Sequence, residues 1–378
     1  MSDNASVVIF PAVFAHNKLD LLVSNIKKIL EIQNQKFQKI RKDNSVIVVE
    51  ANDPVFASSV INLLFGIERV AIAKQVKNEY DTIVSAITKI GSNLLLKGDR
   101  FYVKVEGQAK GYLPKDVEIT ATSSLIEKTI KLGAKPGTED KYDKLLYTYL
   151  TKLNAYVCIF TDKGNGGIPN NSQKEKLVCC IYDELSAVSC LETIREGFDV
   201  KIIVCFRKES DLLNLVKIVN NLIPRTLKSK IELEFFQILI NGTSSQNYLL
   251  LVEIVTEVIL SIALLNKLKR VSLAVSPLVF PQFFIDRVTS RVYQKNIIPH
   301  IPLSGIDENI LDCAKEIGLE KYLSRIERLG KMKFNSVIRS KNNVQIIAQQ
   351  VLKTKRVVTI TVGPNNVHDI LDGLESNH

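Results

Sequence analysis

Four short, strongly apolar runs separated by amphipathic helical segments constrain the fold of this chain more than any other feature. The runs lie at residues 177–181, 200–206, 231–236 and 271–275. A strand that is apolar along most of its length is typical of a sheet covered on both faces. Helical periodicity fills the intervals, at residues 184–196, 210–222, 247–268 and 279–294. Strands that alternate with helices predict a doubly wound, parallel, Rossmann-like α/β sheet.

The N-terminal part of the chain predicts smaller α+β units. Residues 7–10, 46–49 and 69–75 are typical of strands, with helices expected at 18–32 and from Pro54 to about residue 65. Asp53 is expected to cap the second helix, because Asp before Pro is a common helix start. This β-α-β-α-β order predicts a ferredoxin-like domain over residues 1–75.

A second α+β block follows it. Helices are expected at 81–96 and 116–132, and strands at 101–106 and 156–160. The composition of residues 163–171, KGNGGIPNN, predicts a loop, at which we place a domain boundary. With 378 residues, the chain is long enough for several α/β and α+β domains with their own cores.

The last part of the chain is less regular. A helix is expected at 307–317, ended by Gly318, and residues 331–378 form a basic C-terminal extension. In it, residues 341–352 predict a helix and 356–362 a strand. This extension either enlarges a basic surface or adds one strand to the sheet.

The charge balance favours a polyanionic partner. Fifty Lys and Arg against 40 Asp and Glu leave a formal net charge of +10. Smaller basic clusters lie at residues 331–333, 339–341 and 353–356. Any single cluster is also explained as a solvated face, but several together make RNA the leading partner. DNA is less favoured because no helix-turn-helix pattern occurs. The basic and aromatic residues that we select as RNA-binding candidates are Lys36, Lys39, Arg41, Lys42, Lys104, Lys110, Tyr112 and Lys115.

Catalytic and metal-binding patterns are missing from the sequence. The four histidines are far apart, and the adjacent Cys179 and Cys180 point to opposite faces of a strand, so they cannot share one ion. We therefore predict no catalytic residue, no metal and no cofactor. Six cysteines in so long a chain predict a cytosolic protein without a disulfide framework. No signal peptide or membrane span is expected, since Glu253 and Glu257 interrupt the longest apolar run.

The turn after the first apolar strand is poorly suited to a phosphate. In α/β sheets a phosphate site lies where glycine-rich backbone meets a helix N-terminus. The turn at residues 181–186, IYDELS, contains no glycine. It places Asp183 and Glu184 at the positive end of the helix, where their charges stabilise the helix and repel a nucleotide.

Four short segments, taken in order, resemble the tRNA 4-thiouridine synthetase (tRNA sulfurtransferase) family. They are 65–67 (FGI), 101–104 (FYVK), 164–169 (GNGGIP) and 302–307 (PLSGID). The resemblance implies a ferredoxin-like domain at 1–75, a THUMP domain at 76–165 and a PP-loop ATP-pyrophosphatase domain at 166–330. It also implies tRNA as the partner, gripped at its 3′ end by the THUMP domain.

The departures from the family pattern concern its chemistry. The family's S-G-G-x-D-S loop, which cradles ATP phosphates, falls on residues 181–186, where only Ser186 survives. Ser186 is thus the one residue that we assign, as a vestige, to cofactor binding. The family's T-G-E-x-x-x-Q segment retains only Gln282, and residues 248–257 lack the usual cysteine and basic residues. The resemblance therefore implies a degenerate PP-loop on a conserved scaffold.

These patterns leave three hypotheses for the function. The first is a tRNA-binding protein that lacks ATP-dependent adenylation and assists a separate tRNA-modifying enzyme. The second is an active tRNA sulfurtransferase with a rearranged ATP site, which by family association extends to thiamine biosynthesis. The third is a homodimer or scaffold that uses the apolar helix at 248–265 as its interface, although a buried core helix is the favoured explanation of that segment.

Overall fold

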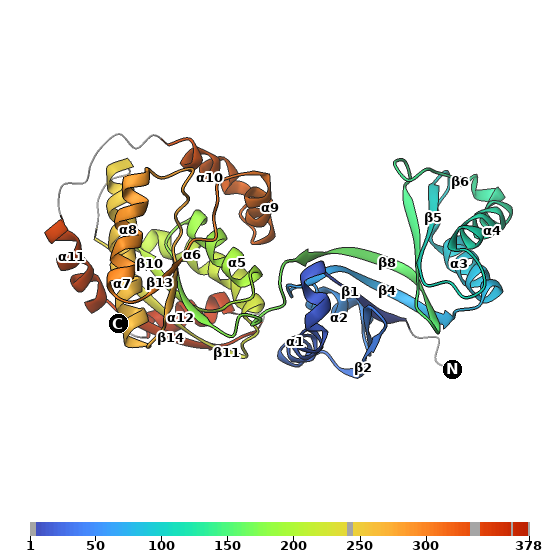
Figure 1. Cartoon of the computed structure of the whole chain (residues 1–378), viewed down its shortest axis with the longest axis horizontal. Coiled ribbons are helices and arrows are strands. Elements are labelled where there is room, and N and C mark those ends of the chain that lie inside the picture. The colour runs from blue at the N-terminus through green and yellow to red at the C-terminus, as the bar shows by residue number, and fades with distance from the viewer. Residues whose placement is uncertain (1–4, 240–244, 333–340, 364–365, 377–378) are drawn as a thin grey trace. The chain divides into compact units, whose positions relative to one another are not determined.

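The computed structural model describes residues 5–239, 245–332, 341–363 and 366–376 (Figure 1). The chain forms two compact units, Met1–Pro169 and Asn170–His378. The first unit contains an eight-stranded sheet and the second a six-stranded sheet. The protein is thus a mixed α/β protein with two sheets.

The first half of unit 1 follows a β-α-β-β-α-β order. Its elements are β1 (Ser6–Pro11), α1 (Leu19–Ile32), β2 (Phe37–Asp43), β3 (Val46–Ala51), α2 (Pro54–Ile61) and β4 (Ile67–Lys77). The strands lie in the antiparallel order β2-β3-β1-β4. Asp53 caps α2, as the sequence predicts, by accepting hydrogen bonds from two backbone amides. Helix α2 ends at Ile61, earlier than expected.

Strand β2 is an element that the sequence analysis missed. Its sequence, FQKIRKD, has polar residues on both faces because β2 lies at the edge of the sheet. It pairs with β3 through a tight turn in which Asn44 adopts a left-handed φ of 55°. The basic cluster at residues 36–42 therefore lies mostly on an edge strand and not in a connecting loop.

The second half of unit 1 continues the same sheet. Its elements are α3 (Tyr80–Leu94), β5 (Arg100–Gly107), α4 (Pro114–Lys128), β6 (Lys135–Pro136), β7 (Lys144–Leu150) and β8 (Asn154–Gly166). The sheet order runs on as β4-β8-β7-β5-β6. Strands β4 and β8 pair along their whole length, so the expected boundary near residue 75 falls inside β4.

The segment at residues 163–166 was expected to be a loop, but it is the end of β8. A Cβ atom on Gly164 would lie 2.3 Å from the carbonyl oxygen of Ile67 on β4. The glycines here therefore serve a close approach between two strands. The compact units divide just beyond, between Pro169 and Asn170.

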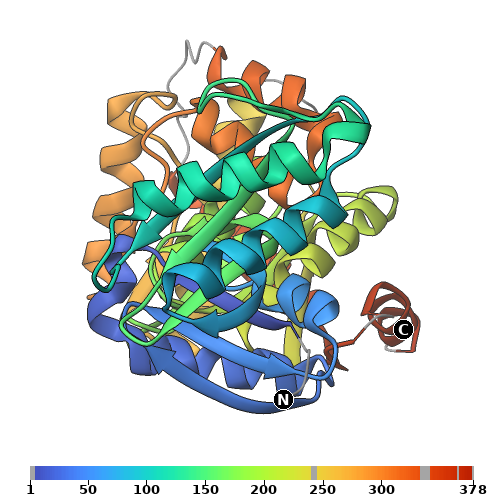
Figure 2. The same ribbon diagram turned by 90° about the vertical axis from the view of Figure 1, so that its right-hand side faces the viewer.

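Strand alternation gives β5 two different faces. Phe101, Val103 and Val105 are buried in one hydrophobic cluster. Helices α3 and α4 lie over this face of the sheet (Figures 1 and 2). Side chains alternate along a strand, so Tyr102, Lys104 and Glu106 lie on the opposite face.

Unit 2 contains the parallel sheet that the apolar runs predict. Its strands are β9 (Lys176–Ile181), β10 (Asp199–Phe206), β11 (Lys230–Gln237), β12 (Arg270–Ser272), β13 (Ile298–His300) and β14 (Arg356–Thr361). The order is β13-β12-β9-β10-β11-β14, with all neighbours parallel except β14, which pairs antiparallel with β11. The C-terminal extension thus adds one edge strand, one of the two alternatives that the sequence leaves open.

The described residues of unit 2 form eight α-helices, of which six match the predicted segments to within a few residues, whereas those at residues 323–330 and 366–375 were not predicted. They are α5 (Glu184–Arg195), α6 (Glu209–Leu222), α7 (Ser245–Leu265), α8 (Gln282–Gln294), α9 (Glu308–Glu316), α10 (Leu323–Gly330), α11 (Lys341–Lys353) and α12 (Asn366–Glu375). Short 3-10 helices lie at Val13–Lys18, Ile130–Leu132, Ile223–Thr226 and Glu320–Tyr322.

Helix α7 forms the centre of the hydrophobic core of unit 2. Residues Asn247–Leu265 are long and apolar enough to cross a membrane, but 72% of the segment is buried inside the protein. Its Glu253 is completely buried and pairs with Arg287 and Arg291 of α8, at 3.0 and 3.3 Å. The helix is therefore a core element, and its apolar surface is largely used within its own unit.

Candidate nucleic-acid interface

A small hollow in unit 1 gathers basic and aromatic side chains. Its volume is about 100 Å³, and it lies among β4, β5, β7 and the turn that precedes β7. It is lined by Arg69, Tyr102, Lys104, Glu106, Glu139, Tyr142, Leu145 and Tyr147. Of these residues, the sequence analysis assigned only Lys104 to RNA binding.

Arg69 is the main residue that the sequence analysis missed. Its guanidinium carbon lies 4.5 Å from the ring centroid of Tyr147 and 5.5 Å from that of Phe10. The guanidinium makes no hydrogen bond or ion pair with the residues that the structure describes. A stacked guanidinium keeps its in-plane donors available, which suits recognition of phosphate. The available signal was one arginine directly before the apolar run at residues 70–73 of the same strand.

Lys104 is not a free cation. Its ammonium nitrogen lies 3.0 Å from Glu139 Oε1 and 3.1 Å from Glu106 Oε1. These hydrogen bonds, first that to Glu139 and then that to Glu106, raise the pKa of Lys104 above its ordinary value. Burial alone would raise the pKa of Glu106, but hydrogen bonds from Tyr147 and Lys104 lower it.

The other predicted residues of the segment after β5 also differ in whether they have a partner within the protein. Lys115 pairs with Glu118 at 2.8 Å, and the Tyr112 hydroxyl donates to the side chain of Asn78. Lys110 is exposed and has no ion pair within the described part of the chain. Of the three, Lys110 is the one whose charge is available to a partner.

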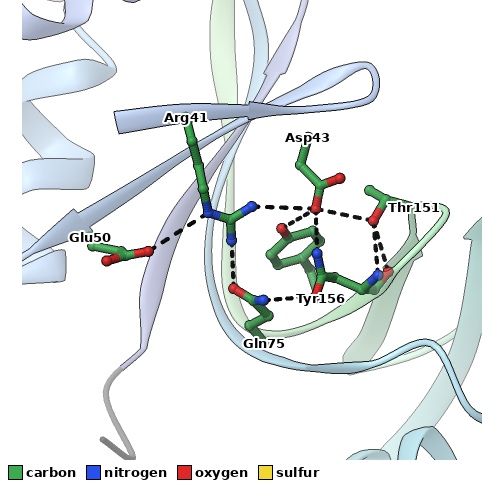
Figure 3. Close-up of polar contacts among 7 residues, drawn as sticks. Arg41, Asp43, Glu50, Gln75, Thr151 and Tyr156 are labelled. Carbon is green, nitrogen blue, oxygen red and sulfur yellow. Dashed lines mark hydrogen bonds and ion pairs between the residues drawn. The ribbon is translucent and has the colours of Figure 1, made fainter. Parts of the chain in front are cut away.

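The second predicted cluster, on and beside β2, also contains both exposed side chains and side chains that have partners within the protein. Lys36 and Lys39 are exposed, whereas Lys42 pairs with Asp20 at 2.6 Å. Arg41 is turned into the protein, where it donates to Gln75 of β4 at 2.6 Å and lies 3.5 Å from Asp43 (Figure 3). The Arg41 guanidinium is thus used to join β2 to β4.

Asp43 is the centre of this internal network. Its Oδ2 accepts hydrogen bonds from the Tyr156 hydroxyl, from Asn154 at 2.9 Å and from Thr151 at 3.1 Å (Figure 3). Burial alone would raise the pKa of Asp43, but the hydrogen bonds, first that from Tyr156, lower it. The network holds the edge strand β2 to the rest of unit 1, and we assign it a role in the stability of the fold.

The three smaller basic clusters lie in the C-terminal extension. Lys355 pairs with Glu234 at 3.1 Å and Arg356 with Glu209 at 2.8 Å. Lys333 and Arg339 lie outside the described residues. Net charge does not distinguish the units either, since residues 1–169 contain 23 Lys and Arg against 18 Asp and Glu, and residues 170–378 contain 27 against 22, which is +5 each.

In unit 2, the turn at residues 181–186 is closed by its own side chains. Asp183 caps α5 by accepting from the Ser186 amide at 2.8 Å, and Tyr248 donates to the other carboxylate oxygen at 2.8 Å. Ser186 Oγ in turn accepts from the amides of Tyr182 and Asp183, both at 2.9 Å. The adjoining cavity measures only about 10 Å³. Three backbone amides of this turn, those of residues 182, 183 and 186, are therefore already engaged.

Glu184 adds a buried carboxyl group to this turn. It is 6% exposed, and its Oε1 lies 3.0 Å from Arg325 Nη1. Burial, and then the charge of Asp183, raise the pKa of Glu184 above its ordinary value.

A larger hollow lies where β12 and β13 end. It has a volume of about 410 Å³ and is lined by Leu278, Val279, Ser304, Gly305, Ile306, Asp307, Glu327, Gly330 and Lys331. Part of its wall is the segment 302–307. The carboxyl edge of a parallel sheet is where α/β proteins bind ligands.

Comparisons in sequence identify distant relatives of this chain. No family model matches it. It is 22% identical over 187 residues to a probable tRNA sulfurtransferase of Methanosarcina acetivorans, a match that covers 49% of this chain and 45% of that protein. A probable tRNA sulfurtransferase of Methanosarcina mazei matches at the same identity over 49% of this chain and 46% of its own length. The chain spans about half the length of these curated relatives.

Comparisons of structure extend over nearly the whole chain. A 4-thiouridine synthetase, solved as a complex with RNA and with ATP bound, superposes with a TM-score of 0.65 at 12% identity and covers 94% of this chain and 100% of its own. The chain is a distant relative of tRNA sulfurtransferases with a 4-thiouridine synthetase fold. PH1313 of Pyrococcus horikoshii matches with a TM-score of 0.60 at 16% identity, over 86% of this chain and 99% of its own.

Proposed function

We propose that this relative of the tRNA sulfurtransferases binds tRNA through unit 1, does not adenylate it, and assists a separate tRNA-modifying enzyme in the cytosol. In this proposal residues 1–75 are the ferredoxin-like domain, 76–165 the THUMP domain and 166–330 a degenerate PP-loop domain. Residues 331–378 are a C-terminal extension that completes the second sheet. The observation that carries the proposal is the fold shared with a synthetase that was solved in complex with RNA.

The surface of unit 1 supports the RNA-binding part. Exposed lysines at 36, 39 and 110 can neutralise phosphates, and Arg69 offers free donors in the hollow. Tyr102 and Tyr142, which also line the hollow, are stacked on each other with ring centroids 6.0 Å apart. Aromatic rings next to cations are typical of surfaces that bind single-stranded RNA.

The closed turn of unit 2 supports the absence of adenylation. ATP phosphates need free backbone amides where a strand meets a helix N-terminus, and here the side chains of Asp183 and Ser186 occupy the amides of residues 182, 183 and 186. An added phosphate would also meet the carboxylates of Asp183 and Glu184 at short range.

A filter-binding titration with tRNA at about 50 mM and about 200 mM salt tests the proposal. We expect tight binding at low salt and a marked loss at high salt. The triple variant K36Q/K39Q/K110Q should reduce the slope of log Kd against log salt concentration by about 2. Each contact with a single-strand phosphate contributes about 0.7 to this slope.

The matched control is K217Q/K267Q/K295Q, which removes three exposed lysines from unit 2. It should bind tRNA as the unmodified protein does. No binding at low salt, or an equal loss in both triple variants, would contradict the proposal.

The second candidate is an ATP-dependent tRNA sulfurtransferase with a rearranged site. The hollow of about 410 Å³ at the ends of β12 and β13 favours it, because this volume is within the range of small-molecule sites. Calorimetric titration with ATP separates the two candidates, and we expect no saturable heat. Saturable ATP binding, together with loss of 4-thiouridine from the tRNA of a deletion strain, would favour the enzyme. A thiamine requirement of that strain would extend it to thiamine biosynthesis.

A further inference from the structure

The two cations of the unit 1 hollow differ in their partners. The Arg69 guanidinium stacks on two aromatic rings, and its charge helps to lower the pKa of Glu106, but it makes no hydrogen bond or ion pair with the described residues. Lys104, by contrast, is bracketed by two carboxylates. The hollow therefore contains two positive and two negative side chains. A binding site for an anion with this composition must first release one of its own carboxylates.

The two carboxylates are held very differently. Glu106 lies on β5 and also accepts a hydrogen bond from the Tyr147 hydroxyl at 2.8 Å, so the sheet fixes its position. Glu139 lies in a tight turn closed by the Thr138–Lys141 bridge, and its side chain is 66% exposed. Within the described residues its one ion pair is to Lys104. Exposed ion pairs contribute little to stability, so this carboxylate can be displaced at small cost.

We propose that the hollow is a phosphate subsite, in which a phosphodiester of bound RNA lies between Arg69 and Lys104 and replaces the carboxylate of Glu139. In the free protein Glu139 occupies this place and lowers the affinity for RNA. The inference rests on the proposed tRNA binding and adds to it the anion site and its resident competitor.

The size of the hollow agrees with this ligand. Its volume of about 100 Å³ is well below the ~300–1,000 Å³ of pockets for drug-sized molecules, so it admits one phosphate group and not a whole nucleotide. Phosphate requires donors on more than one side, and the guanidinium fork and the ammonium group supply them from β4 and β5.

The test compares two variants of the same turn. E139Q and D140N each remove one negative charge from it, but only Glu139 contacts Lys104. We expect E139Q to bind tRNA about two- to fivefold more tightly, the range that release of one exposed ion pair allows. D140N should bind as the unmodified protein does at about 150 mM salt, since the Debye length is then about 8 Å.

A double-mutant cycle with K104Q assigns the effect to the lysine. K104Q alone should weaken binding, and E139Q should give no gain in the K104Q background. E139Q should also increase the slope of log Kd against log salt concentration by about 0.7. In this variant RNA binding releases a counterion from the Lys104 contact, whereas in the unmodified protein it displaces the Glu139 carboxylate. R69K, which keeps the charge but loses the planar fork, should weaken binding with an unchanged melting temperature.

The outcomes separate the inference from the function on which it rests. Tight binding by the unmodified protein with equal affinities for E139Q and D140N overturns the phosphate subsite and leaves tRNA binding intact. A gain from E139Q that persists in the K104Q background also overturns it. Failure of every variant to bind tRNA at low salt overturns both.

Discussion

Both units place one of their own carboxylates where a phosphate could bind, but the two carboxylates are held with very different strength. In unit 2, Asp183 at the start of α5 accepts one hydrogen bond from a backbone amide and another from the Tyr248 hydroxyl. In unit 1, Glu139 is mostly exposed and pairs with one lysine side chain. A carboxylate that completes a helix cap is part of the fold, whereas one on an exposed turn is a competitor that a ligand can displace.

Asp43 extends this comparison to a carboxylate of unit 1 that several side chains hold by hydrogen bonds. D43N should lower the free energy of unfolding of this region by about 2–3 kcal/mol, because several hydrogen bonds to a charged group are weakened together. Hydrogen–deuterium exchange of β2 and β3 measures it. D20N is the control, since Asp20 is 91% exposed and pairs only with Lys42 among the described residues. Similar exchange in both variants would show that the network is not structural.

The cap of α5 should give the next largest effect. D183N should lower the free energy of unfolding of unit 2 by about 1 kcal/mol, because the amide is a weaker partner for Tyr248 and for the helix N-terminus. Urea unfolding measures it, with D211N in the first turn of α6 as the control. The variant should still bind no ATP, because Ser186 continues to occupy two amides. ATP binding by D183N would show that one charge alone closes the turn.

The pH dependence of stability should also separate the two kinds of carboxylate. The pKa of Asp43 is lower in the folded protein than its ordinary value of about 3.9. Asp43 therefore stabilises the fold above that value, and this contribution is lost as the pH falls through the folded pKa. Melting temperatures between pH 7 and pH 3 should fall less steeply for D43N than for the unmodified protein. Parallel curves would contradict this assignment.

Glu139 should have the smallest effect on stability. E139Q should change the free energy of unfolding by less than about 0.5 kcal/mol, as expected for an exposed ion pair. Thermal unfolding monitored by circular dichroism measures the change, in the same preparation that is used for tRNA binding. A large destabilisation by E139Q would place Glu139 with Asp183 among the structural carboxylates.

Regular packing made much of unit 2 predictable. The strands that became β9, β10 and β11 are apolar because helices cover both faces of their sheet, and this pattern is visible in a single sequence. Strand β2 was missed because an edge strand has no such pattern. The closed turn at Asp183 was also predictable, since a helix cap involves neighbours in the chain.

The candidate site in unit 1 was only half predictable. The sequence by itself determined that Lys104 follows Tyr102 on one face of a strand, because alternation along a strand is local. Only the tertiary structure decided that Glu139 binds Lys104 and that Arg41 is turned inward to Gln75. Lys104 and Glu139 are 35 positions apart in the sequence, and Arg41 and Gln75 are 34 positions apart. The sequence shows that a lysine carries a positive charge. Whether this charge is available to a partner depends on which carboxylates the folded backbone brings within about 4 Å of the ammonium nitrogen.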